Sequence, residues 1–415
     1  MERLANQLTI KYAFLQSTYW ICQCAIYSFA AVFLQSKNFN NMQIGIVLAL
    51  AAILSIILQP VVAAFADKTK KVPLRYIVAV LMVMVYLLVI LLYLLPNSFL
   101  LTAVIYVIVG AISFTLNPLF NSLALEYLNR GIPMNYGLAR GMGSIAFAIM
   151  SYLLGNLVNR FGAGIIPVMF IGTYCFAILS AFLFKIELPE TMVSTDLNPG
   201  SGISVTSGRE PFKETAPTGI LTFFIKYKKF SFFLIGVSMI FYSHSLINTY
   251  LINIMKQVGG GSTDMGISLS IAATLELPAM AGFIYIIRKI SSNKLVMVAA
   301  FFFFIKAFIT WLAPNVLMIH VSQACQMLSY AIFTPASVYY VNSIVEDHDK
   351  VKGQAMLGVA TLGIAGSIAN ITGGKILDTF GVSDMLLLGT LVTALGFVIV
   401  MFSTEKPREK AKGMS

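Results

Sequence analysis

Long apolar runs separated by short polar segments repeat from one end of the chain to the other. Each run holds about 20 residues or more, which is the length that a helix needs to cross the hydrocarbon core of a bilayer. The pattern predicts an all-α membrane protein with twelve transmembrane helices, near residues 12–34, 42–65, 74–95, 99–126, 136–158, 164–184, 229–255, 264–287, 294–313, 317–344, 353–374 and 384–403.

Composition supports a membrane protein, because 58% of the residues are hydrophobic, only 11% are charged and the mean hydropathy is +0.84. The net charge of +11 raises the question of nucleic-acid binding. If both termini are cytoplasmic, however, 22 of the 28 Lys and Arg residues fall on the inner side, and the outer loops hold only Lys37, Arg160, Lys256 and Lys375. This asymmetry follows the positive-inside rule. It predicts a multi-pass protein of the cell membrane with both termini in the cytoplasm and does not imply nucleic acid as a partner.

The longest polar stretch divides the chain into two sets of six spans. We expect an N-terminal bundle at 1–184, a cytoplasmic linker at 185–228, a C-terminal bundle at 229–403 and a cytoplasmic tail at 404–415. The two bundles resemble each other at offsets of 216 to 219 residues, in the pairs Gly155 and Gly374, Phe161 and Phe380, and Gly137 and Gly353. Two parallel six-helix repeats with a site between them describe the major facilitator architecture.

Two motifs carry a family resemblance. The run Asp67-Lys68-Thr69-Lys70-Lys71 resembles the loop motif of the major facilitator superfamily, although Ala63 and Lys70 stand where glycines are usual. The run from Tyr136 to Ser144 resembles the lactose permease and phenylpropionate permease branch of that family. The resemblance implies a transporter with alternating access, in which Asp67 and Lys71 serve the inner gate. A solvated loop is the alternative for these two residues.

The same branch implies roles for other residues. The arginine at the position of Arg140 contacts substrate there, and Glu276, Lys306 and His244 fall where the branch carries functional side chains. The chain also departs from the branch. Ser122 replaces a substrate-binding carboxylate, with Glu126 one turn further on, and Gln326 and Ser329 replace a His-x-x-Glu pair used in proton coupling. The coupling mechanism of the lactose permease therefore cannot be carried over unchanged.

Arg140 is the most informative residue of the chain. A guanidinium keeps its charge at any ordinary pH, and burying it in a membrane helix costs about 2.5–3.5 kcal/mol. Ser144 and Phe147 follow at i+4 and i+7 and share its helix face. A cation, a hydroxyl and an aromatic ring suit a sugar or an aromatic acid, so we predict that these three residues bind substrate. An Arg140 that pairs with an acidic group to pin neighbouring helices is the alternative.

Glu276 is the one carboxylate that the pattern places well inside a span, and Lys306 lies in the next predicted helix. Burial disfavours the charged form of a carboxylate, so we predict that Glu276, Lys306 and Glu126 take part in proton coupling. A permanent Glu276–Lys306 ion pair is the competing interpretation. Further polar residues in spans should face a water-filled cavity, and we predict substrate contacts from Tyr19, Gln23, Asn121, His244, Asn248 and Gln326. Asn117, Pro118 and Asn121 indicate a locally distorted fourth span.

Two other histidines receive structural interpretations. His320, near the outer end of the tenth span, is expected to be structural or interfacial. His348 lies in the loop run Glu346-Asp347-His348-Asp349, whose charges are expected to be solvated; we predict no metal site and no cofactor.

The sequence predicts a secondary active transporter that imports a small polar solute, most simply a sugar or oligosaccharide, by proton symport, as a monomer in the bilayer. A carrier of aromatic acids or nucleosides, and a proton-independent facilitator, remain alternatives; a membrane receptor without transport is disfavoured by the buried charges. No Walker loop, His-Glu-x-x-His or Gly-x-Ser-x-Gly sequence indicates an enzyme.

Overall fold

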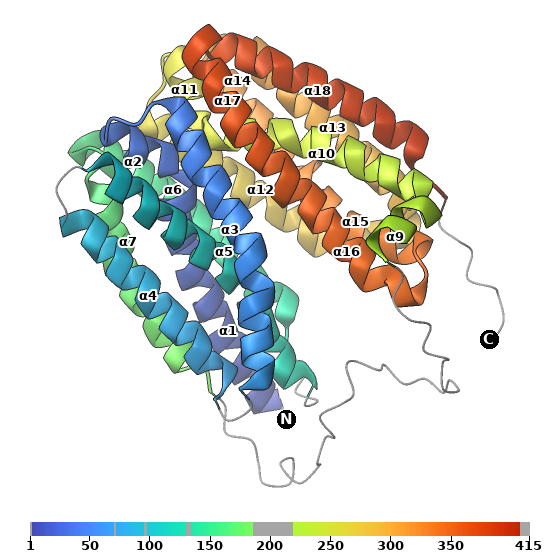
Figure 1. Ribbon diagram of the computed structural model, residues 1–415, viewed down its shortest axis with the longest axis horizontal. Helices are drawn as coiled ribbons and strands as arrows, with labels where there is room; N and C mark the ends of the chain where they lie inside the picture. The colour runs from blue at the N-terminus through green and yellow to red at the C-terminus, as the bar shows by residue number, and fades with distance from the viewer. Residues whose placement is uncertain (1, 70–71, 95–97, 130–133, 186–218, 407–415) are drawn as a thin grey trace.

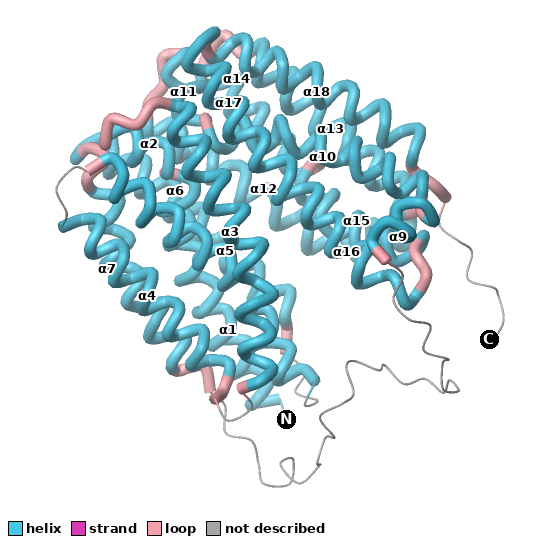
Figure 2. Tube along the Cα trace, viewed as in Figure 1, coloured by secondary structure: helices cyan, strands magenta, loops and turns pink. Residues whose placement is uncertain are grey.

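The structure is a computed structural model, and it describes residues 2–69, 72–94, 98–129, 134–185 and 219–406. These residues form helices and connecting loops, arranged as two bundles (Figures 1 and 2). Helices are the natural solution for this composition, because a helix satisfies its backbone N–H and C=O groups internally where lipid offers no partner. The all-α fold predicted from the sequence is confirmed.

The N-terminal bundle contains six spans. Its first span is bent by 48° between its two α-helical parts, with a π-helix, η1 (Cys24–Ser28), at the junction. The α-helices of this bundle are α1 (Glu2–Gln23), α2 (Ala30–Ser36), α3 (Asn41–Lys68), α4 (Leu74–Leu94), α5 (Phe99–Asn129), α6 (Tyr136–Phe161) and α7 (Ile165–Phe182).

The C-terminal bundle repeats the plan with more interruptions. Its short helices η2 (Cys325–Met327), η3 (Asp347–Asp349) and η4 (Val359–Ala365) lie in or beside the tenth and eleventh spans. Its α-helices are α9 (Ile220–Lys226), α10 (Lys228–Thr249), α11 (Leu251–Gln257), α12 (Ser262–Lys289), α13 (Ser292–Leu312), α14 (Val316–Ala324), α15 (Tyr330–Ile344), α16 (Lys350–Gly358), α17 (Gly366–Phe380) and α18 (Val382–Ser403).

The number of spans agrees with the prediction. By length and composition, eleven helical segments of the described residues can cross a membrane, and the bent first span makes twelve. Short helix α9 falls inside the segment predicted as a linker, most of which (186–218) lies outside the described residues, as do residues 407–415 of the predicted tail. The division into two bundles and a linker otherwise stays a prediction.

The prediction of a distorted fourth span is wrong. Helix α5 runs without a break through Pro118, and Asn121 lies within it. Pro118 has no N–H to donate to the carbonyl four residues before it, yet the helix continues on both sides of this missing hydrogen bond. The irregular turns instead lie in the first, tenth and eleventh spans, where the α-helix gives way to a π-helix or a 3-10 helix.

The two bundles touch along two seams, where α3 packs against α17 and α6 packs against α12. Glycines make both contacts possible. A Cβ on Gly155 of α6 would lie 2.6 Å from the Ser262 carbonyl oxygen, and one on Gly374 of α17 would overlap the Asn41 carbonyl. Gly155 and Gly374 are a pair of the sequence repeat, so the repeat places a glycine at each seam.

The seams lie toward the end of the molecule opposite the chain termini, which we call the distal end. Figure 1 shows α3 beside α17 there, and the two bundles diverge toward the end that carries the termini. Hydrogen bonds between the bundles gather at the distal end, for example from the Gln35 amide nitrogen to Asn253 Oδ1 at 2.8 Å. The arrangement is a V that is joined at its distal end.

Candidate functional site

Arg140 lies in the first turns of α6, close to Trp20 of α1. Its guanidinium carbon is 4.9 Å from the centre of the indole ring, a cation–π contact. Gly143, one turn further along α6, allows this approach, because a Cβ there would lie 2.5 Å from Trp20 Cδ1. Among the described residues, no carboxylate oxygen lies within 4.0 Å of Arg140. A tight ion pair that pins neighbouring helices is therefore not what the structure contains.

Trp20 is held by a chain of hydrogen bonds along α1. Its indole N–H donates to Gln16 Oε1 at 3.1 Å, and Gln16 Nε2 donates to the Tyr12 hydroxyl at 2.7 Å. That hydroxyl donates to Asn121 Oδ1 of α5 at 3.2 Å. Asn121, which is predicted to bind substrate, is thus the last residue of the hydrogen-bonded series that holds the Trp20 ring beside Arg140.

Tyr19 and Gln23, also predicted to bind substrate, are turned into the bundle. Tyr19 is 3% exposed, and both the Tyr19 hydroxyl and the Gln23 amide donate to the backbone carbonyl of Ser113 in α5, at 3.0 and 3.3 Å. Their polar groups tie α1 to α5, and substrate contact by Tyr19 and Gln23 stays a prediction.

The residue of this helix that reaches Arg140 is Trp20, which the sequence reasoning missed. The chain contains only two tryptophans, and Trp20 lies between the predicted residues Tyr19 and Gln23. The rarity of tryptophan was the available signal, whereas the prediction rested on the polar groups of Tyr19 and Gln23.

Three side chains of the C-terminal bundle form a chain of hydrogen bonds. Lys306 Nζ of α13 donates to Gln326 Oε1 at 2.6 Å, and Gln326 Nε2 donates to Glu276 Oε1 of α12 at 3.0 Å. Lys306 and Gln326 are buried, and Glu276 is half-buried. The competing interpretation, a direct Glu276–Lys306 ion pair, is not found in the described part of the chain, because the Gln326 amide stands between the two charges.

Arg140 and Glu276 face each other from opposite bundles. Arg140 belongs to α6 and Glu276 to α12, the two helices of one seam, and Glu276 lies within electrostatic range of both Arg140 and Lys306. The next residue along α12, Leu277, lies 3.4 Å from the position that a Cβ on Gly141 would take. The positive side chain of one bundle is therefore set near the carboxylate of the other.

His244 of α10 borders this group. Its ring stacks on Tyr330 of α15 with ring centres 5.3 Å apart and an interplanar angle of 12°, and its Nε2 is 3.0 Å from Asn248 Nδ2. Nδ1 is buried and has no hydrogen-bond partner among the described residues. Tyr330 in turn lies within electrostatic range of Glu276 and Arg140. The predicted residues His244, Asn248, Glu276 and Gln326 are thus gathered on one wall.

The remaining predicted residues are spread more widely. Ser144 and Phe147 are half-buried on α6, and Phe147 packs edge-on against Trp20 at 6.2 Å between ring centres. Glu126 is exposed near the terminus end of α5. Lys71 and the side chain of Asp67 lie outside the described residues, so their gating role stays a prediction.

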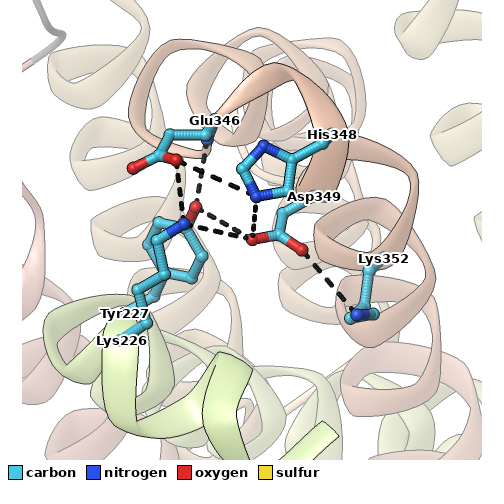
Figure 3. Close-up of polar contacts among 6 residues, drawn as sticks. All are labelled: Lys226, Tyr227, Glu346, His348, Asp349 and Lys352. Atoms are coloured by element: carbon cyan, nitrogen blue, oxygen red, sulfur yellow. Dashed lines mark hydrogen bonds and ion pairs between the residues drawn. The ribbon is translucent and has the colours of Figure 1, made fainter. Parts of the chain in front are cut away.

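The charges of the loop before α16 are not simply solvated, which corrects the sequence interpretation. Asp349 is fully buried, and Figure 3 shows cationic and hydroxyl groups around its carboxylate. Lys226 Nζ lies 3.5 Å away, the Tyr227 hydroxyl 3.2 Å and His348 Nε2 3.3 Å, all from Oδ2, while Lys352 Nζ is 3.7 Å from Oδ1.

The same cluster joins α9 to the loop before α16. Lys226 Nζ also donates to Glu346 Oε2 at 2.8 Å, and this hydrogen bond raises the pKa of Lys226 above its ordinary value. The cluster therefore attaches α9 to the C-terminal bundle.

The arrangement between the bundles suits polar binding within a membrane. One wall offers a guanidinium, a tryptophan and a phenylalanine, and the other offers a carboxylate, two amides, a lysine and a stacked His–Tyr pair. Such a set can accept and donate several hydrogen bonds while aromatic rings cover apolar faces of a solute.

The comparisons with known proteins agree with this fold. A model of the MFS_1 like family matches residues 10–388. The uncharacterized transporter YwbF of Bacillus subtilis is 23% identical over 376 residues, which cover 91% of this chain and 88% of that protein. The maltose permease of Geobacillus stearothermophilus is 22% identical over 389 residues, with 92% and 91% covered.

Solved structures resemble this chain in fold. The nucleoside transporter NupG superposes with a TM-score of 0.74 at 13% identity, over 96% of this chain and 98% of that one. A bacterial homologue of the lysosomal transporter Spinster, inward-facing and unoccupied, gives a TM-score of 0.62 at 12% identity, over 97% and 96%.

Proposed function

This chain belongs to the MFS_1 like family, and on that premise we propose that it imports a sugar or oligosaccharide by proton symport. Its family and relatives are transporters of the major facilitator type, so the chain is a multi-pass membrane transporter and not an enzyme. The observation that carries the proposal is the pair of facing walls, with Arg140 on Trp20 opposite the Glu276–Gln326–Lys306 chain.

A sugar fits these walls chemically. Its hydroxyls need several donors and acceptors, which Arg140, Gln326, Asn248 and Glu276 supply in one place. Its C–H faces pack on aromatic rings, which Trp20 supplies. The full-length relationship to a maltose permease supports the same class.

Proton coupling rests on Glu276. As a carboxylate it attracts Arg140 across the seam between α6 and α12. A proton on Glu276 removes that attraction, which lets the two bundles move while Lys306 keeps its bond to Gln326. Solute and proton are then linked, because both act on the same carboxylate. Glu126 is exposed near the end of α5 that lies toward the chain termini, and its role as a second proton site stays a prediction.

The orientation follows from the basic loops. We place the termini and the diverging end in the cytoplasm and the distal end outside, which makes this conformation closed to the outside. The Lys and Arg asymmetry of the sequence supports this placement in the cell membrane.

A nucleoside is the second candidate. The stacked rings of His244 and Tyr330 form a flat aromatic surface, and a planar base can extend such a stack. The ribose of a nucleoside would use the same hydrogen-bonding partners as the proposed sugar. Only the flat surface of His244 and Tyr330 would therefore distinguish the two solutes.

The first test uses purified protein in vesicles with radiolabelled maltose and an inward proton gradient. We expect maltose to accumulate and the accumulation to vanish when a protonophore collapses the gradient. A thermal-shift screen of sugars, nucleosides and aromatic acids accompanies it. Stabilisation by nucleosides alone would replace the proposed solute, and accumulation that ignores the protonophore would rule out symport.

The second test replaces Glu276 by Gln and measures maltose counterflow, an exchange that needs no net proton movement. Accumulation should be lost while counterflow remains, since the glutamine keeps the shape of the side chain but cannot bind a proton. Asp384→Asn, a carboxylate change in the first turn of α18, is the control. Loss of both activities in Glu276→Gln would assign this residue to binding or structure rather than to coupling.

A further inference from the structure

Polar side chains continue from Glu276 toward the distal end of the C-terminal bundle, beyond the residues that the proposed function uses. Ser268 of α12 is fully buried, and its hydroxyl lies 2.7 Å from His320 Nδ1 of α14. Ser268 and Glu276 are eight residues apart on the same helix, a rise of about 12 Å. The Ser268–His320 pair therefore forms a second polar level, nearer the distal end than Glu276 and Gln326.

Gln323 lies between the two levels. It is three residues after His320 and three before Gln326, so the three side chains fall along one side of the helix. The 3-10 turn at Cys325–Met327 strengthens this alignment, because side chains three apart eclipse in a 3-10 helix. Helix α12 packs against α14 and this turn, which holds the two polar levels on neighbouring helices.

Gln323 departs from the general rule that buried polar groups are hydrogen-bonded. It is 0% exposed, and neither its amide nitrogen nor its amide oxygen has a partner among the described residues. Burying an unpaired amide costs about 1–3 kcal/mol, and such groups in native proteins commonly bind an internal water molecule. Two more hydroxyls are close in sequence or space, since Thr310 of the neighbouring helix α13 donates at 3.0 Å to Ser322, the residue before Gln323.

We propose that His320, Ser268 and Gln323 form the route by which protons reach Glu276 from the outer side while the distal end is closed to solute. His320 is half-buried and lies within electrostatic range of Asp264 in the first turn of α12, so it connects to the distal surface. Water held by the Gln323 amide bridges the gap between His320 and the Gln326–Glu276 pair. The inference rests on the proposed symport and adds its proton path.

The transfer balances without any oxidant or cofactor. The His320 ring takes a proton from outer water on Nε2 and releases the proton on Nδ1 to the Ser268 hydroxyl oxygen, which gives up its own proton toward the buried side. Water at Gln323 accepts that proton and passes on another. The last step forms an O–H bond on Glu276, whose carboxylate becomes a neutral carboxyl.

The test uses the full-length transporter in vesicles, with maltose as the probe, and compares Gln323→Met and His320→Phe with wild type. Methionine keeps the length of the glutamine but cannot hold water. We expect proton-driven accumulation to slow by about tenfold or more, with maltose counterflow within about twofold of wild type. Preserved counterflow also shows that each variant folds. Thr390→Val, which removes a buried hydroxyl bonded to Leu386 and Ala307 off the path, should match wild type in both assays.

Each outcome decides something different. Accumulation at the wild-type rate in both variants would overturn the proton route and leave the proposed symport intact. Loss of counterflow in parallel with accumulation would make these residues structural and would also overturn the route. Wild-type accumulation that persists after the gradient collapses would overturn the proposed symport itself, and the route with it. His320→Gln, which keeps a polar side chain but cannot relay a proton through a ring, should slow accumulation as His320→Phe does.

Discussion

The two seams that join the bundles are related by the sequence repeat, yet they differ in charge. At the α3–α17 seam the Asp378 carboxylate accepts hydrogen bonds from the backbone N–H groups of Asn41 and Met42, at 3.1 and 2.8 Å, and from the Asn41 side chain at 2.7 Å. At the α6–α12 seam the equivalent position, 219 residues earlier, is Asn159. This neutral amide lies 4.0 Å from the position that a Cβ on Gly261 would take.

Because only the α3–α17 seam has this carboxylate, we expect the two seams to contribute differently when the distal end opens. A carboxylate at a helix N-terminus is stabilised by the helix dipole and by the free N–H groups there, so Asp378 fastens the α3–α17 seam. At the start of α12, by contrast, the N–H of Gly261, the residue before the helix, already donates to Asp264 Oδ2 of the same bundle at 2.8 Å. The α6–α12 seam instead carries Arg140 and Glu276. We therefore propose that the α3–α17 seam acts as a latch and that the α6–α12 seam couples the candidate site to movement.

The largest effect is expected from a substitution at a close backbone contact of the α6–α12 seam. A Cβ on Gly266 of α12 would overlap the Ser151 carbonyl of α6, so Gly266→Val should keep the distal end from closing. Overpacking costs about 1–3 kcal/mol, which corresponds to a loss of maltose uptake of about fivefold or more. The measurement is labelling by an impermeant maleimide, from outside, of a cysteine placed at Leu48, a residue that lines a small hollow with Gln23 and Tyr27.

The control for this substitution lies on the same helix. A Cβ on Gly282 would meet nothing within 4 Å, so Gly282→Val should transport and label like wild type. Equal labelling of the Gly266 and Gly282 variants would show that close packing at the α6–α12 seam does not hold the distal end shut.

A smaller effect is expected from the latch. Asp378→Asn keeps a side chain of the same shape but removes the charge at the N-terminus of α3. Such charges contribute about 0.3–1 kcal/mol at exposed sites, so the open fraction, and with it the labelling at Leu48→Cys, should rise by up to about fivefold. Asp384→Asn removes a carboxylate from the first turn of α18 and should leave labelling unchanged. A latch role is rejected if the two variants label alike.

The smallest effect is expected from copying the latch to the other seam. Asn159→Asp brings a charge toward the N-terminus of α12, but Asp264 already holds the Gly261 N–H and repels a second carboxylate. Labelling at Leu48→Cys should fall by less than about twofold. A decrease larger than the increase caused by Asp378→Asn would mean that the two seams are equivalent and that the proposed division between them is wrong.

Much of the architecture could be predicted from the sequence, because hydrophobic length and charge asymmetry act locally along the chain. The twelve spans, the repeat of Gly155 and Gly374, and the depth of Glu276 and Lys306 follow from such patterns. The candidate site was harder to predict from the sequence. Gln326 was recognised as a departure from a family motif, but its place between Glu276 and Lys306 depends on how α12, α13 and η2 pack.

Several differences between the sequence interpretation and the structure have the same origin. Tyr19 and Trp20 are neighbours in sequence, and only the packing of α1 against α5 decides which of them turns toward Arg140. The charges around Asp349 read as a solvated loop because Lys226, 123 residues away, cannot be paired with it from sequence. Pro118 indicated a distortion, but α5, which packs against α3 and α4, continues through it.

The sequence by itself determined that this protein spans the membrane, that its two halves are related and that it carries charges at membrane depth. The physical reason is that transfer into lipid costs free energy for every polar residue without a partner, so apolar runs mark the spans and the few charges within them stand out. Only the tertiary structure decided which charges face each other, which amide separates them and which seam carries the latch. Those contacts join residues as far apart as Asn41 and Asp378, 337 positions along the chain, and no local pattern constrains so distant a pair.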